Sequence, residues 1–324
     1  MTQDANRGRR TAGITLMVGV LLLCASGCSN QGGGAVDPSS SRSASQSAGA
    51  PAQREYRDVS YSDTSSRNQL NLYLPTTGEG PFPVIVYIHP GGYVIGDKDL
   101  EIPELREAAR ARGYAVASVG YRLVDEAGFP AQIQDVKAGI RWLRANAQEY
   151  ALDESRVAVW GVSAGGHLAA LAATSDGVAQ FENEALGNPE QSSSVQAAVD
   201  WFGPANFVTL ARYLDAQRRQ TGLPRLQLDP ITRQITASPN LAKAANPASH
   251  ADPTDPPILI QHGDRDDVVP LSQSQELAAE MKRKMGAEKV TFRVERGEGH
   301  ATAFFVSTEN IERILDWLDE ALGR

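Results

Sequence analysis

Cysteine is almost absent from this sequence: Cys24 and Cys28 are the only two in 324 residues, and both lie near the N-terminus. The remainder of the chain can form no disulfide, and we expect no catalysis through a cysteine thiolate. Positive charge is also in deficit, with 31 Lys and Arg against 39 Asp and Glu and a formal net charge of -8. Because proteins that bind nucleic acid present a basic surface, this balance argues against a nucleic-acid partner.

The N-terminal region has no apolar run of membrane-spanning length. The run from Ile14 to Cys24 is shorter than the ~20 residues that a spanning helix needs. Basic residues precede this run and small residues follow it, which is the order of an export signal. The small residues directly before Cys28 resemble the lipobox of bacterial lipoproteins, in which the cysteine is acylated. We therefore expect residues 1–27 to be a signal peptide and Cys28 to be a lipid anchor, with plain secretory cleavage as the alternative.

The next segment, residues 28–53, is rich in Gly, Ser, Ala and Gln and holds almost no large apolar side chain. Such a composition buries too little apolar surface to fold, so we expect a flexible tether. Residues 54–324 then form one domain. The sequence thus predicts an exported protein that a lipid holds to the membrane at the periplasmic or extracellular face of the cell envelope.

Strand-like and helix-like patterns alternate through the domain. Continuous apolar runs predict buried strands at 84–88, 115–119, 157–160, 195–201, 258–260 and 290–294. Apolar residues at helical spacing predict a helix after Pro130 and another from 311 to 322. This alternation predicts an α/β fold of three layers with a mainly parallel central sheet. Active residues should then lie at the C-terminal ends of the strands.

Two stretches depart from that regular alternation. Leu70, Leu72 and Leu74 alternate with polar residues, which predicts a half-exposed strand; a turn then leads to 84–88, and we expect this first hairpin to be antiparallel at one edge of the sheet. Residues 204–255 are polar and rich in proline. A loop of that length is typically functional, so we expect a lid-like insertion over the active site, with one or two short helices around 207–217. A disordered surface excursion is the alternative.

A serine lies in a glycine-flanked pentapeptide, Gly161-Val162-Ser163-Ala164-Gly165, between an expected strand and an Ala-rich helix. A nucleophile elbow requires this context, because the serine sits in a tight turn where a Cβ at Gly161 or Gly165 would clash with the neighbouring strand and helix. A serine hydroxyl also needs a base within hydrogen-bond reach, itself oriented by a carboxylate. We predict Ser163 as a nucleophile.

The base is chosen from five histidines. Four of them belong to other elements: the end of the 84–88 strand, the nucleophile's own helix, the insertion and the end of the 258–260 strand. His300 lies instead in a glycine-rich turn between the last expected strand and the terminal helix, where an imidazole can reach the serine. We predict His300 as the base. The acid should follow the 258–260 strand, where Asp264, Asp266 and Asp267 compete.

Backbone donors for an oxyanion are expected in His89-Pro90-Gly91-Gly92-Tyr93, which follows the 84–88 strand. Glycines let the backbone approach a substrate closely. We therefore predict an oxyanion hole from the N–H groups of Gly91, Gly92 and Ala164. Proline at 90 has no N–H and cannot contribute.

Taken together, these motifs resemble those of α/β-hydrolase fold esterases of the hormone-sensitive-lipase and carboxylesterase-like group, and in particular the branch of bifunctional feruloyl and acetyl-xylan esterases. Stretches such as Tyr121-Arg122-Leu123 and Asp200-Trp201-Phe202-Gly203-Pro204 extend the likeness over about 56–322. In such enzymes the acid stands in His-Gly-x-x-Asp-x-x-Val, which the segment 262–269 matches. The resemblance therefore implies Asp266 as the acid.

The same motifs lead us to expect hydrolysis of a small-molecule carboxylic ester through a Ser-His-Asp triad, with no cofactor and no metal. Two alternatives stay open. The turn around Asp266 also resembles that of prolyl-oligopeptidase-type serine peptidases, although the chain has no room for their large N-terminal propeller. A surface-tethered binding protein that keeps the fold without catalysis is the other. A plant-polysaccharide ester as substrate is implied only by the family resemblance.

Overall fold

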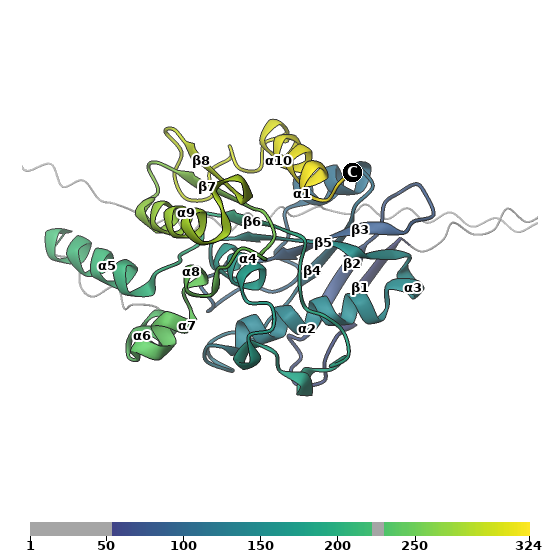
Figure 1. Cartoon of the computed structure of the whole chain (residues 1–324), viewed down its shortest axis with the longest axis horizontal. Coiled ribbons are helices and arrows are strands. Elements are labelled where there is room, and N and C mark those ends of the chain that lie inside the picture. Colours follow the sequence, from purple (N-terminus) through teal and green to yellow (C-terminus); the bar gives the residue numbers. More distant parts are fainter. Residues whose placement is uncertain (1–53, 222–229) are drawn as a thin grey trace, which may run out of the picture. The chain divides into compact units, whose positions relative to one another are not determined.

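The computed structural model describes residues 54–221 and 230–324, so the expected signal peptide, Cys28 and the tether lie outside the described residues. Eight described strands form one sheet in the order β1-β2-β4-β3-β5-β6-β7-β8 (Figure 1). They are β1 (Glu55–Ser60), β2 (Gln69–Tyr73), β3 (Phe82–Ile88), β4 (Ala115–Val119), β5 (Leu152–Val162), β6 (Ala197–Trp201), β7 (Ile258–Gly263) and β8 (Val290–Glu295). From β4 to β8 every neighbouring pair is parallel. This is the α/β-hydrolase fold that the alternating pattern and the resemblance predict.

Helices cover both faces of the sheet. They are α1 (Pro103–Ala111), α2 (Ala131–Ala145), α3 (Ala147–Tyr150), α4 (Ala164–Thr174), α5 (Phe207–Thr221), α6 (Pro230–Thr236), α7 (Pro239–Ala244), α8 (Pro247–His250), α9 (Ser272–Met285) and α10 (Thr308–Ala321). Short 3-10 turns occur at Ala179–Phe181, Glu184–Leu186 and Ala287–Lys289. In the described part of the chain, no helix is both long and apolar enough to cross a bilayer.

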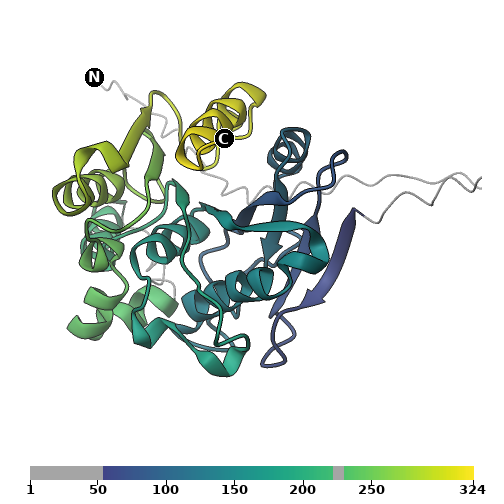
Figure 2. The same cartoon turned by 45° about the vertical axis from the view of Figure 1, so that its right-hand side comes forward.

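The period of two along the strands divides the core into two layers. On β3, Val84, Val86 and Ile88 pack in the cluster that holds α2, α4 and α9. Ile85 and Tyr87 point the other way, into the cluster that holds α1 and α10. Both views show α1 and α10 side by side (Figures 1 and 2). Because both faces of β3 are covered, the strand reads as a continuous apolar run.

The N-terminal edge differs from the predicted hairpin. β2 does not pair with β3: it lies between β1 and β4 and is antiparallel to both. Nor is it half exposed, because Asn71 is buried together with Leu70 and Leu72. The Asn71 amide is satisfied there, accepting from the backbone N–H of Asp58 at 3.0 Å and donating to Asp99 at 2.7 Å. The alternating pattern predicted that Asn71 would be exposed, but its side chain is buried and hydrogen-bonded.

The segment 204–255 carries α5, α6, α7 and α8, more helix than the one or two short ones expected around 207–217. Figure 1 shows these helices together on the left of the view, on the α4 and α9 side of the sheet. The buried side chains of Phe207, Ile231, Ile235 and Ala245 join the same core cluster as α4. The described part of the insertion is thus packed into the domain.

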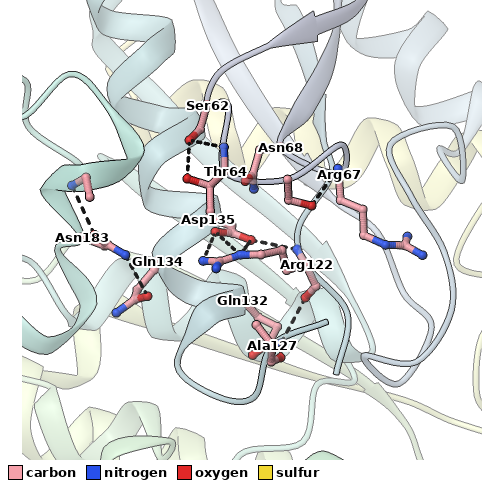
Figure 3. A network of polar contacts seen from close by, with 12 residues as sticks. Ser62, Thr64, Arg67, Asn68, Arg122, Ala127, Gln132, Gln134, Asp135 and Asn183 are labelled. Atoms are coloured by element: carbon pink, nitrogen blue, oxygen red, sulfur yellow. Dashed lines mark hydrogen bonds and ion pairs between the residues drawn. The ribbon is translucent and has the colours of Figure 1, made fainter. Parts of the chain in front are cut away.

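A polar network fixes the chain where it leaves β4 and approaches α2 (Figure 3). Asp135 of α2 has a fully buried side chain and accepts from the guanidinium of Arg122 at 2.7 Å and from its backbone N–H at 2.8 Å. Gln132 donates to the Arg122 carbonyl at 3.0 Å and to Ala127 at 2.7 Å. A bidentate pair of this kind is specific in geometry, so it sets the path of the segment that precedes α2.

Candidate active site

Ser163 lies at the turn between β5 and α4, at the C-terminal edge of the sheet. Its backbone has φ 54° and ψ -116°, a conformation that residues other than glycine rarely adopt. Two backbone hydrogen bonds hold it: Ser163 N–H donates to Trp201 O at 2.9 Å, and His167 N–H donates to Ser163 O at 3.1 Å. The strand of β6 and the first turn of α4 therefore fix a strained turn that projects the hydroxyl from the sheet.

The two glycines that flank this turn have no room for a side chain. A Cβ on Gly161 would lie 1.9 Å from the carbonyl oxygen of Gly165, and a Cβ on Gly165 would lie 2.1 Å from the carbonyl oxygen of Ile88. Both contacts are far below van der Waals distance. The second one shows that the start of α4 rests directly on the end of β3.

Ser163, His300 and Asp266 lie in one hydrogen-bonded line. His300 Nε2 is 3.0 Å from Ser163 Oγ, and His300 Nδ1 is 2.7 Å from Asp266 Oδ2. Because Nδ1 faces a carboxylate, it carries the ring proton, and Nε2 is then free to accept from the serine hydroxyl. The structure thus brings together the three side chains that the sequence singles out, although they are separated by up to 137 residues.

Burial separates Asp266 from its two neighbours in the same turn. Asp266 is 7% exposed, whereas Asp264 and Asp267 are exposed. Burial by itself would raise the pKa of the Asp266 carboxyl, but hydrogen bonds from His262 and His300 outweigh it and hold this pKa well below its usual value. Asp266 therefore stays ionised at neutral pH and can orient a histidine.

Hydrogen bonds join the loop that carries Asp266 to the loop that carries His300. Asp264 N–H donates to Glu295 O at 3.0 Å, and Arg265 N–H donates to Glu298 O at 2.9 Å. The Asp264 carboxylate accepts from Gly297 N–H at 2.7 Å. These contacts join the segment after β7 to the end of β8 and the segment that follows it. They hold His300 close to Asp266.

The predicted oxyanion residues begin the loop after β3. Gly91, Gly92 and Tyr93 have φ values of 127°, 59° and 65° in succession. A Cβ on Gly91 would lie 2.0 Å from Ile95 O, because the chain folds back over it. Ile88 is paired with Gly161 across the β3 and β5 strands, so this loop and Ala164 lie at the same edge of the sheet.

Aromatic packing supports His89, which begins this loop. The ring of His89 stacks on Tyr121 with 4.1 Å between centroids and 5° between planes. Tyr121 donates its hydroxyl to His89 O at 3.0 Å, and His89 Nδ1 donates to Pro90 O at 2.7 Å. The residue beside Tyr121 is Arg122, whose ion pair with Asp135 fixes this segment. His89 is a buried support and not a second base.

His262 is a site residue that the sequence reasoning did not identify. Its Nε2 lies 3.2 Å from Asp266 Oδ2 and 2.8 Å from Val269 O, while Nδ1 lies 2.7 Å from the Ser274 hydroxyl. Two acceptors at Nε2 mean that this nitrogen carries the proton. Asp266 therefore receives hydrogen bonds from two histidines. The motif that contains His262 was quoted only as a resemblance, and nothing in its spacing shows the side-chain contact.

Among residues 54–221 and 230–324, no three side chains of His, Cys, Asp or Glu are gathered as a metal ion would need. What the arrangement can do is activate a hydroxyl: a serine held clear of the sheet, a base on its oxygen, a carboxylate behind the base, and glycine-rich backbone at the same edge.

Comparison with known proteins places this geometry in a family. The family model BD-FAE matches residues 70–281. Among curated relatives, esterase LipC of Mycobacterium tuberculosis is 30% identical over 226 residues, which is 68% of this chain and 53% of LipC. Esterase LipQ of the same organism is 28% identical over 82% of this chain and 61% of its own. The chain thus spans about half the length of the curated relatives it matches.

Solved structures agree with that assignment. A truncated carbohydrate esterase from gut microbiota is 29% identical, with a TM-score of 0.73 over 84% of this chain and 97% of that one. A bifunctional GH43-CE protein of Bacteroides eggerthii is 28% identical, with a TM-score of 0.71 over 83% of this chain and 38% of that one. Esterase 2 of Thermogutta terrifontis, at 23% identity and a TM-score of 0.64 over 80% of this chain and 92% of that one, shares the fold.

Proposed function

The chain belongs to the BD-FAE family, and from this premise we propose that it hydrolyses carboxylic esters with Ser163 as nucleophile, His300 as general base and acid, and Asp266 as the residue that orients His300. The observation that carries the proposal is the hydrogen-bonded line of these three side chains, with 3.0 Å from base to hydroxyl and 2.7 Å from base to acid. The esterase relatives support ester hydrolysis as the reaction.

In the acylation step, Ser163 Oγ attacks the ester carbonyl carbon while His300 Nε2 takes the hydroxyl proton. The carbonyl oxygen becomes an oxyanion, which the backbone N–H groups of Gly91, Gly92 and Ala164 meet. When the tetrahedral intermediate collapses, the bond to the alcohol breaks, and His300 gives its proton to the departing oxygen. Asp266, which stays ionised, stabilises the imidazolium while it exists.

In deacylation, water is the nucleophile and Ser163 is the leaving group. His300 takes a proton from water as the water oxygen adds to the acyl carbon. The second intermediate then collapses, the bond between the acyl carbon and Ser163 Oγ breaks, and His300 returns the proton to Oγ as the acid leaves. All proton transfers and the charge stabilisation use groups of the chain itself, so the proposal includes no metal and no cofactor.

A panel of nitrophenyl esters with increasing acyl length tests the proposal on the purified chain. Wild type should show turnover that falls to background in Ser163→Ala. Ser155→Ala is a matched control, because Ser155 lies on β5, the strand that leads to Ser163, is exposed, and donates its hydroxyl to Asp153 two residues away; it should keep wild-type activity. Equal rates for wild type and Ser163→Ala would contradict the proposal.

The substrate class is taken from the relatives. Among the similar solved structures, one at 29% identity is described as a carbohydrate esterase and one at 28% identity as a bifunctional GH43-CE protein. We therefore propose acyl esters of a sugar as substrates for this chain. Release of acetate from a peracetylated sugar, compared with release from nitrophenyl acetate at equal concentration, measures this preference; no release from the sugar ester would contradict it.

We also propose that the enzyme is exported and held at the cell envelope by lipid on Cys28. The order of basic residues, apolar run and small residues before Cys28 supports this. Mass spectrometry of the N-terminal peptide from cells should find a diacylglycerol adduct on Cys28, and Cys28→Ser should move the protein from the membrane fraction to the soluble one. An unmodified Cys28, or cleavage at another residue, would contradict the proposal.

A further inference from the structure

A completely buried histidine lies on the first turn of α4, four positions after Ser163. His167 is 1% exposed. Its Nδ1 is 2.8 Å from the hydroxyl of Tyr93, and its Nε2 is 2.7 Å from the carbonyl oxygen of Ala245. Tyr93 follows the oxyanion glycines, and Ala245 lies between α7 and α8 of the insertion. One imidazole therefore joins two segments that are 152 positions apart along the chain.

The partners of His167 determine which ring nitrogen carries the proton. Ala245 O can only accept, so Nε2 carries the hydrogen and Nδ1 presents a lone pair. The Tyr93 hydroxyl must then donate to Nδ1. Burial lowers the pKa of His167 to about 4, which keeps the ring neutral near pH 7. The direction of both hydrogen bonds is thus set, from Tyr93 to His167 and from His167 to Ala245.

The beginning of the insertion touches the same ring. Phe207, the first residue of α5, packs edge-on against His167 with 5.1 Å between centroids and 83° between planes. It also packs on Tyr93 at 6.5 Å. Phe207 is 1% exposed. Two separate parts of the insertion, at 207 and at 245, therefore enclose the contact between His167 and Tyr93.

The backbone conformation of Tyr93 needs contacts from other segments to stabilise it. Its φ of 65° follows φ values of 127° at Gly91 and 59° at Gly92, and only the last of the three residues carries a side chain. A residue with a Cβ stays in this region when surrounding contacts impose it. The Tyr93 hydroxyl bond to His167 is one such contact, and Val124 N–H to Tyr93 O at 2.9 Å is another. Releasing Tyr93 would relax the backbone that presents the donors.

We propose that His167 is a positioning residue that couples the insertion to the oxyanion hole. By holding Tyr93, it keeps the N–H groups of Gly91 and Gly92 aimed at the acyl oxygen, and through Ala245 and Phe207 it makes this alignment depend on the seating of the insertion. The segment 204–255 then contributes to stabilising the tetrahedral intermediate, beyond any contact it makes with substrate. The inference rests on the proposed function of these glycines.

The His167 ring can be replaced one nitrogen at a time. Gln at this position can reach Ala245 O but offers Tyr93 no nitrogen lone pair at the place of Nδ1, whereas Asn can offer an amide oxygen there but does not reach Ala245. Tyr93→Phe removes the hydroxyl alone. The matched control is Tyr114→Phe, which loses a comparable hydrogen bond, 2.6 Å to Asp319, on the opposite layer of the core.

The readout is affinity for an arylboronic acid, which adds to the serine and places a tetrahedral oxygen where the oxyanion forms. Because misaligning a donor costs less than the 10²- to 10³-fold of deleting one, Tyr93→Phe and His167→Gln should each weaken boronate binding by about tenfold and lower kcat by a similar factor, with little change in KM. His167→Asn, which keeps an acceptor for Tyr93 and loses the bond to Ala245, should bind the boronate more tightly than His167→Gln but more weakly than wild type. Tyr114→Phe should match wild type.

Thermal unfolding of each variant separates positioning from stability. If Tyr93→Phe and His167→Gln bind the boronate as wild type does, or if all variants lose activity only in proportion to lost folded protein, the positioning role is refuted. Non-additive losses in the double variant of Tyr93→Phe and His167→Gln should accompany the expected result. The ester panel on wild type and Ser163→Ala tests the proposed function separately, so the two ideas can fail independently.

Discussion

Replacing Asp266 by Asn exchanges one carboxylate oxygen for an amide NH2 group, so an acceptor of hydrogen bonds becomes a donor. Asp266 Oδ1 accepts from the backbone N–H groups of Val268 and Val269 at 2.9 and 2.8 Å. Oδ2 accepts from His300 at 2.7 Å and from His262 at 3.2 Å. An asparagine oxygen can keep the backbone pair. Its amide nitrogen then takes the place of Oδ2 and points hydrogens at two histidine donors.

His300 must respond by changing tautomer. With an amide donor at its Nδ1, the ring can bond only if Nδ1 accepts and Nε2 carries the proton. An Nε2 that carries a proton cannot take one from Ser163, which lies 3.0 Å away. We expect kcat to fall by about 10⁴-fold, the loss known for a triad whose histidine is held in the wrong tautomer. That loss corresponds to about 5.4 kcal/mol in activation free energy.

The assay is kcat for nitrophenyl acetate at saturating concentration, with two neighbouring variants as controls. Asp264→Asn and Asp267→Asn alter exposed carboxylates, and an asparagine oxygen at 264 can still accept from Gly297. Each should stay within about twofold of wild type, as surface changes typically do. Similar losses in all three variants, or retention of more than about a tenth of the wild-type kcat in Asp266→Asn, would refute the assignment of the acid.

Further expectations concern the fold around the site. Gly165→Ala puts a Cβ 2.1 Å from Ile88 O, so we expect urea unfolding to show a loss of about 3 kcal/mol together with lost turnover, and unchanged stability would contradict the close contact. Asp135→Ala leaves Arg122 without the bidentate partner seen in Figure 3, so unfolding should cost about 3 to 5 kcal/mol less, and a double change of both residues to apolar ones should restore part of it. Burial raises the pKa of Asp200 to about 6, above its unfolded value, so the stability from its proton is complete below about pH 4 and is lost as the pH rises through about 6. Wild type should therefore lose about 3 kcal/mol relative to Asp200→Asn as the pH rises from below about 4 to well above about 6; a difference that does not vary with pH would contradict this.

The strained strand-to-helix turn at Ser163, the proposed nucleophile, could be predicted because its signal is local. A strand, a glycine-flanked serine and a helix follow one another within 157–174, and the steric reason for both glycines holds at 1.9 and 2.1 Å. The parallel strands could be predicted for a similar reason, since strands buried on both faces are apolar at every position.

Asp266, the proposed acid, could not be chosen from the residues alone. Asp264, Asp266 and Asp267 share one turn, and the property that distinguishes Asp266 is burial against two histidines, which arises only when β7 and β8 lie together. The choice therefore depended on family resemblance. Asn71 illustrates the same limit: its polarity indicated exposure, but its partners are on other segments of the chain.

The roles of His167 and His262 were missed because their partners are not visible in a linear reading. His167 bonds Ala245, 78 residues further on, and Tyr93, 74 residues back. His262 is close to Asp266 in sequence, yet only the folded turn brings its Nε2 to the carboxylate. Side chains that support a site leave weaker local patterns than side chains that react.

The long separation of the site residues along the chain also bears on the order of steps in refolding. Ser163, Asp266 and His300 follow β5, β7 and β8, and 137 residues separate Ser163 from His300. Local helices form quickly, whereas contacts between distant segments must first overcome the entropy of closing long loops. A refolding chain will therefore recover its helical signal before it recovers turnover. The return of the proposed activity would therefore report when the segments after β5, β7 and β8 have come together.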